Sequence, residues 1–209
     1  MKNLFLTVAS VVFAIQAFAS DGYLIYENTA GVGKEKFVFG PSVAPNLACN
    51  SSNLADYAGR DKASGDGYWA ELWYAPAPNA QEPDLLRVPN SKSGFRTGSL
   101  AGLIQGNTKL FIPGTLGGDH VTLQLRAWVN NGDEITTWEE AWGRGWSNVI
   151  PDFELSGVDA NGVTVKGDGN LAVKLSYTCI GYPIPEPSLG AMGAVGLLAM
   201  IWRRFQMAC

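Results

Sequence analysis

The sequence contains few of the side chains that most often carry catalysis. It has one histidine, His120, in 209 residues, whereas a hydrolytic metal site normally takes two or three His, Cys or carboxylate ligands. No serine lies in a G-x-S-x-G turn, so His120 has no hydrolase-type nucleophile beside it. Glu139 and Glu140 are adjacent and would point in different directions on a helix, so they cannot form a glycosidase pair together. We therefore expect a protein that is not an enzyme and uses no metal or cofactor.

Helical periodicity is also nearly absent, as are internal repeats and any linker long enough to divide the chain into two domains. Short runs of alternating polarity occur instead, separated by clusters of Gly, Asn and Asp, and glycine alone accounts for 25 residues. This pattern predicts an all-β fold, a single antiparallel β-sandwich of the jelly-roll or Ig-like kind.

Residues 120–129, "HVTLQLRAWV", are the clearest predicted strand. The odd-numbered residues from Val121 to Val129 are predicted to face the core, and the even-numbered ones, from Thr122 to Trp128, to face outward. Residues 67–75, "GYWAELWYA", carry aromatics on both faces, so we expect a loop or a partner to cover their outer face. Further strands are predicted at residues 23–28, 36–40, 109–113, 149–155, 163–167 and 170–179.

Two local patterns predict connections. Thr137 and Glu140 form a capping box at the start of "TTWEEAW", which predicts one short helix over residues 136–142. The sequence "KGDGN" at residues 166–170 lies between two alternating runs and predicts a hairpin.

The first 19 residues have the three parts of a secretory signal. Lys2 precedes an apolar run, and Ala17 and Ala19 form an A-x-A cleavage site ahead of Ser20. A helix here has no polar face to turn toward solvent, which favours a signal helix over a buried helix of the domain.

The other end of the chain carries a second apolar segment. No ionisable side chain occurs in the 15 residues 188–202, and Arg203 and Arg204 follow. As a helix these residues cover roughly 22 Å, which flanking residues and local thinning can extend to the roughly 30 Å of a bilayer core. Arginines on the cytoplasmic side agree with export of the preceding domain. We predict a transmembrane helix at 188–202, with an amphipathic or core helix as the alternative.

Pro185, Glu186 and Pro187 precede this helix and, with Arg203 and Arg204 behind it, resemble the tripartite tail of PEP-CTERM sorting-domain proteins, a group of bacterial exported proteins. The resemblance implies an exosortase-type membrane processing enzyme as partner, a temporary anchor, cleavage near Pro-Glu-Pro, and transfer or release to the cell surface. The phrases "AELWYAP", "FRTGSLAG", "LQLRAW" and "TWEEAWGRGWSNV" are similar, in the same order, to those of small exported β-sandwiches in that group. For the tail, a permanent single-span anchor is the alternative to a temporary anchor that is cleaved.

These ends divide the chain into a signal peptide (1–19), an exported domain (20–182) and a sorting tail (183–209). Without Lys2, Arg203 and Arg204, twelve basic residues remain, and without Glu186, eighteen acidic ones, so the exported part carries a net charge of −6. An acidic domain without a basic patch is a poor candidate for nucleic acid. The turn at 60–68 contains Asp61 and Asp66 but lacks EF-hand spacing, so a solvated turn is expected, with a structural calcium ion as the alternative.

Cys49 and Cys179 are the two cysteines of the exported part, because Cys209 follows the arginines. An oxidising compartment favours a disulfide between them, and closing that loop would stabilise the fold by roughly 4–5 kcal/mol. Two separate buried thiols are the alternative.

Tryptophan is the strongest signal left, with six of the seven residues in the exported part. Buried tryptophans fill a core, whereas exposed ones can stack on the apolar face of a sugar ring. Trp128, Trp138, Trp142 and Trp146 are the candidates for such stacking, with Trp128 the most favoured because it lies on an outer face. We expect a structural or adhesive component of the cell surface or extracellular matrix, with a carbohydrate-binding module as the alternative and polysaccharide as its partner.

Overall fold

The computed structural model describes residues 21–42, 51–106 and 109–181. Several predicted features lie outside these ranges: the signal helix with Ala17, Ala19 and Ser20, Cys49, and the tail with Pro185, Glu186, Pro187, Arg203 and Arg204. Within the described ranges no helix is long and apolar enough to cross a membrane, and the predicted span at 188–202 lies beyond them.

The described chain is all-β, as the turn-rich alternating sequence predicts. Its strands are β1 (Tyr23–Ile25), β2 (Val38–Ser42), β3 (Gly65–Ala75), β4 (Leu86–Arg87), β5 (Ser93–Phe95), β6 (Lys109–Phe111), β7 (His120–Val129), β8 (Arg144–Trp146), β9 (Ile150–Glu154), β10 (Gly157–Val158), β11 (Thr164–Val165) and β12 (Thr178–Gly181). Four 3-10 turns join them: η1 (Leu54–Tyr57), η2 (Glu82–Asp84), η3 (Gly98–Leu100) and η4 (Leu171–Val173).

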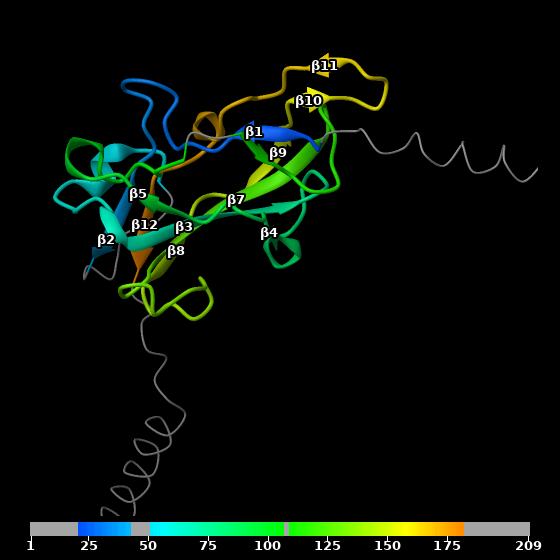
Figure 1. Cartoon of the computed structure of the whole chain (residues 1–209). Coiled ribbons are helices and arrows are strands. Elements are labelled where there is room, and N and C mark those ends of the chain that lie inside the picture. Colours follow the sequence, from blue (N-terminus) through cyan, green and yellow to red (C-terminus); the bar gives the residue numbers. More distant parts are fainter. Residues whose placement is uncertain (1–20, 43–50, 107–108, 182–209) are drawn as a thin grey trace, which may run out of the picture.

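One large sheet has the strand order β2-β12-β8-β7-β3-β4, with β5 also paired to β3 and β9 to β7 (Figure 1). The expectation of a wholly antiparallel sheet is wrong at one edge, because β2 and β12 run parallel, with Val38 opposite Thr178. Two small antiparallel ribbons, β1–β6 and β10–β11, complete the described strands.

The main core lies on one face of the long pair β3–β7. Leu123 and Leu125 of β7 pack there with Leu72 of β3, as the alternation of residues 120–129 predicts. Leu24 of β1 and Leu110 of β6 belong to the same cluster, so the β1–β6 ribbon covers this face. Each fully buried leucine stabilises the fold by roughly 1.5–3 kcal/mol, which makes this layer the main source of stability.

The opposite face of β3–β7, called the outer face below, is buried too. Thr122, Gln124, Arg126 and Trp128 were predicted to face outward, but all four are buried. The loop after β3 covers one end, since Thr122 Oγ1 donates to Ala77 O at 2.8 Å and accepts from Ala80 N at 2.9 Å. The prediction that the outer face of residues 67–75 is covered is therefore confirmed, and loops of the chain itself cover it.

Two predicted connections are wrong. Residues 138–140 form a turn instead of a helix, with only an i to i+3 bond from Ala141 N to Trp138 O (3.3 Å), because the Trp138 side chain packs onto the outer face. The predicted hairpin at 166–170 does not form either. β11 turns back to pair with β10, and Asn170 caps the 3-10 turn η4 by accepting from Ala172 N at 2.8 Å.

Cys179 of β12 is buried and disulfide-bonded. Its predicted partner, Cys49, lies outside the described residues, so the identity of the pair stays a prediction.

Candidate binding site

The register of β3 and β7 builds the outer face from opposing pairs. Trp69 lies opposite Trp128, Glu71 opposite Arg126, and Trp73 opposite Gln124. Directly opposite residues on one face of an antiparallel pair have their side chains in contact range, so the face combines indoles with charged groups. This composition follows from the aromatic residues of 67–75 meeting the even-numbered residues of 120–129.

Arginines and tryptophans alternate across this face in a stack. The Arg126 guanidinium carbon lies 3.8 Å from the Trp73 ring centroid and 4.6 Å from that of Trp138. Arg87 continues the stack beyond Trp73 at 5.4 Å, and Arg144 beyond Trp138 at 4.7 Å. Contacts of this kind are each worth about 0.5–2 kcal/mol, more when desolvated. We refer to these five residues as the Arg–Trp stack.

Arg126 is the centre of the stack and is only 6% exposed. Its Nε donates to Gln124 Oε1 at 2.9 Å, and its Nη2 lies 3.6 Å from Glu82 Oε1, too long for a hydrogen bond. Burial lowers the pKa of Arg126, while Glu82 and Glu139 raise it. An arginine stays protonated under such a shift, so a charged guanidinium with unused terminal N–H donors sits among indole rings.

Carboxylates surround the stack and balance its charge. Arg87 forms an ion pair with Glu139, and its Nε lies 3.7 Å from Glu71 Oε2. Burial raises the pKa of Glu71, whereas the Arg87 charge and the Trp73 indole lower it. The outer face therefore carries charges of both signs close together.

A cavity of about 290 Å³ opens beside Arg126. Its lining residues come from the outer face and from the two loops that cover it: Trp73, Glu82, Pro83, Leu85, Arg126, Trp138 and Glu139. Aromatic walls with a few polar groups are typical of small-molecule sites.

The four tryptophans that were predicted to stack on sugars differ in their exposure to solvent. The prediction for Trp128 is wrong, because this residue is 0% exposed and its Nε1 donates to Ile135 O at 3.2 Å. Trp138 is half-buried and lines the cavity. Trp142 and Trp146 are 44% and 39% exposed, and the Trp146 ring meets Trp138 edge to face at 5.9 Å. Exposed indole surface thus remains at Trp142 and Trp146.

Sequence reasoning missed the polar half of this site. Glu82, Arg126 and Glu139 were not candidate binding residues, since the alternation assigned Arg126 to an outward position of a strand and Glu82 belongs to a Pro-rich loop. The one available signal was the irregular alternation of residues 67–75.

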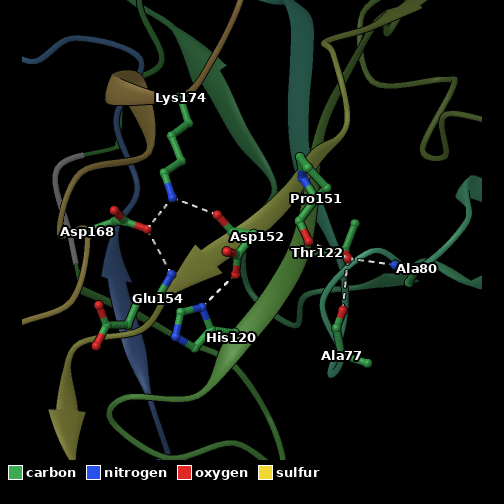
Figure 2. A network of polar contacts seen from close by, with 9 residues as sticks. All are labelled: Ala77, Ala80, His120, Thr122, Pro151, Asp152, Glu154, Asp168 and Lys174. Carbon is green, nitrogen blue, oxygen red and sulfur yellow. Dashed lines mark hydrogen bonds and ion pairs between the residues drawn. The ribbon is translucent and has the colours of Figure 1, made fainter.

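A second polar cluster surrounds the single histidine and joins strands (Figure 2). His120 is the first residue of β7, and its side chain is 49% exposed. Its Nδ1 lies 2.5 Å from Asp152 Oδ1. Lys174 Nζ donates to Asp152 O and to Asp168 Oδ2, both at 2.6 Å, and Asp168 also accepts from Glu154 N at 2.8 Å. Among the described residues no group of three or more His, Cys, Asp or Glu side chains is placed to hold a metal ion.

Asp168→Asn is expected to lower the free energy of unfolding by about 1 kcal/mol at neutral pH, the size of a partly exposed ion pair. Partial burial raises the pKa of Asp168, but the hydrogen bonds from Lys174 and from the Glu154 amide outweigh it and hold that pKa below its ordinary value of 3.8. The stabilisation is therefore present above about pH 4 and is lost as the pH falls through the folded pKa.

Urea denaturation at pH 7 and at pH 3 measures this difference. The exposed Asp84→Asn serves as the matched control, with no loss expected at either pH. An Asp168→Asn deficit that is equally large at pH 3 would show that the carboxylate charge is not the cause.

No family model matches the chain, and neither does any curated protein or solved structure.

Proposed function

We propose that this chain is an exported, surface-sorted β-protein with a structural or adhesive role and no enzymatic activity. The exported part is residues 20–182, and the tail at 183–209 is a PEP-CTERM-type sorting signal that an exosortase-type enzyme processes after insertion of 188–202 in the inner membrane. The domain then reaches the cell surface or the extracellular space.

The observation that carries the adhesive role is the exposure of two large indoles, Trp142 and Trp146, of which Trp146 contacts Trp138 of the Arg–Trp stack. Large exposed aromatics next to a rigid layer suit a contact surface, because they supply much area at little entropic cost. The polar groups around His120 support a non-enzymatic role, since the contacts of Lys174 and Asp168 tie the segment between β11 and β12 to strand β9.

The finer fold is part of this proposal. A two-layer sandwich of the jelly-roll or Ig-like kind is supported by burial of both faces of β7 and by the β1–β6 ribbon over the main core. Because β2 and β12 run parallel, the fold differs at this edge from the purely antiparallel members of that class.

The second candidate function is a carbohydrate-binding module of the extracellular matrix. The cavity beside Arg126 favours it, because its charged lining groups can hydrogen-bond to sugar hydroxyls and the half-exposed Trp146 ring meets Trp138 of its wall. The two candidates differ in one observable, retention of the purified protein by polysaccharide.

Glu186→Ala tests the sorting signal in its native host. We expect the variant to accumulate in the membrane fraction as an unprocessed form, because the acid at the centre of Pro-Glu-Pro is the feature read by the processing enzyme. Fractionation followed by intact-mass measurement detects this. Pro183→Ala, two residues ahead of the motif, is the control and should be processed normally. An unchanged mature mass in Glu186→Ala would count against sorting, and membrane-bound full-length protein in every sample would favour a permanent anchor.

A further inference from the structure

We propose that the cavity beside Arg126 binds one sugar unit of a neutral polysaccharide; this inference rests on the second candidate function, carbohydrate binding. Arg126 gives the first reason. It is nine-tenths buried and lines the cavity, yet among the described residues its only hydrogen bond runs from Nε to Gln124. Among the described residues its terminal N–H groups make no hydrogen bond, although the guanidinium packs between two indole rings and Nη2 forms an ion pair with Glu82 at 3.6 Å. These N–H groups can therefore donate to a ligand, and a buried donor is costly unless a ligand or water accepts from it.

Two carboxylates of the lining provide acceptors. Glu82 and Glu139 are each about half-exposed, so their oxygens can accept from hydroxyl groups of a ligand. A sugar hydroxyl both donates and accepts, which lets one ring use Arg126 and a carboxylate at the same time. A ligand with donors alone or acceptors alone would leave one of these groups unmatched.

The charge balance selects a neutral ligand. Glu82 lies near Arg126, and Glu139 is paired with Arg87, which lies outside the lining, so each carboxylate of the cavity has an arginine close by. An anionic sugar would meet both carboxylates, and a cation would meet Arg126, which already fills the space between the Trp73 and Trp138 rings. Like-charge contacts of this kind disfavour both classes.

The size and walls of the cavity fit a single ring. A volume of about 290 Å³ lies at the lower end of the range of ligand sites. Trp138 forms part of the wall, and the half-exposed Trp146 meets it at 5.9 Å, so indole surface continues outside the cavity. A neighbouring sugar unit of the same polysaccharide can stack there, which explains why a polymer is expected to bind better than a free sugar.

The experiment is affinity electrophoresis of the purified domain in gels that contain a neutral polysaccharide (dextran, laminarin, galactomannan or xylan) or the acidic polysaccharide alginate. We expect at least one neutral polysaccharide to retard the protein and alginate to have no effect. Glu82→Gln together with Glu139→Gln should weaken that binding by about tenfold, since each change removes a charged acceptor. Glu140→Gln, next to Glu139 in the chain but outside the cavity lining, is the matched control and should bind like the wild type. Thermal unfolding checks that all variants are folded.

The outcomes separate the two levels of the proposal. Neutral polysaccharide binding that survives the Glu82→Gln/Glu139→Gln change but is lost in Trp142→Ala/Trp146→Ala would keep carbohydrate binding and overturn the cavity as its site. Alginate binding that strengthens in the Glu82→Gln/Glu139→Gln variant would overturn the neutral class. Retardation by none of the neutral polysaccharides overturns both the cavity inference and the second candidate function, and leaves surface sorting unaffected.

Discussion

Replacing Trp128 by alanine is expected to destabilise the fold by about 3–5 kcal/mol, the cost of removing a large buried aromatic side chain. Trp128 is 0% exposed, its ring lies 6.2 Å from that of Trp69, and its Nε1 donates to Ile135 O. The substitution leaves a cavity under the loop after β7 and removes the partner of a carbonyl group. A domain of this size has only about 5–15 kcal/mol to lose, so a large part of its stability is at stake.

Urea denaturation monitored by far-UV circular dichroism, which does not rely on tryptophan fluorescence, measures the loss of unfolding free energy. Trp146→Ala is the matched control, because the same side chain is removed from a half-exposed position and should cost no more than about 1 kcal/mol. Equal losses in the two variants would contradict the burial of Trp128 and return it to the set of exposed stacking candidates.

Gly145→Ala is expected to disrupt the sheet at its centre. Strand β8 lies between β12 and β7, and a Cβ on Gly145 would stand 1.9 Å from the carbonyl oxygen of Cys179. The obstacle is backbone on the neighbouring strand, so relief requires moving β8 away from β12, which also disturbs its pairing with Ala127 in β7. We expect a loss on the order of 3 kcal/mol or more, beyond that of ordinary overpacking.

Gly67→Ala is the control for this second prediction, since a Cβ on this β3 glycine meets nothing within 4 Å. Soluble yield and the midpoint of thermal unfolding provide the measurements. A Gly145→Ala protein as stable as Gly67→Ala would mean that β8 and β12 do not pack as closely as described.

The sequence predicted the strands better than their surroundings. Residues 120–129 alternate cleanly, and Leu123 and Leu125 face the main core as expected. The same alternation assigns Arg126 and Trp128 to solvent. Alternation cannot distinguish a solvent-exposed face of a strand from a face that another segment covers. Trp138, twelve residues further on, closes over Arg126, and such a tertiary contact has no local signature.

Local rules failed where a distant contact was stronger. Thr137 and Glu140 have the spacing of a capping box, yet the Trp138 ring is held between Arg126 and Arg144 and its Nε1 donates to Gly145 O at 3.1 Å. A helix would turn that ring away. The parallel pairing of Val38 with Thr178 joins segments far apart in the chain, and alternation cannot reveal either the partner or the direction of a strand.

The central claim, that this chain is exported and then sorted by its tail, is tested most directly by the intact mass of the native product. We predict the mass of a chain that begins at Ser20 and ends near the Pro185–Pro187 motif, less two hydrogen atoms for the disulfide of Cys179. Recovery of all 209 residues in one uncleaved chain of 22.4 kDa from the cytosol would contradict the account.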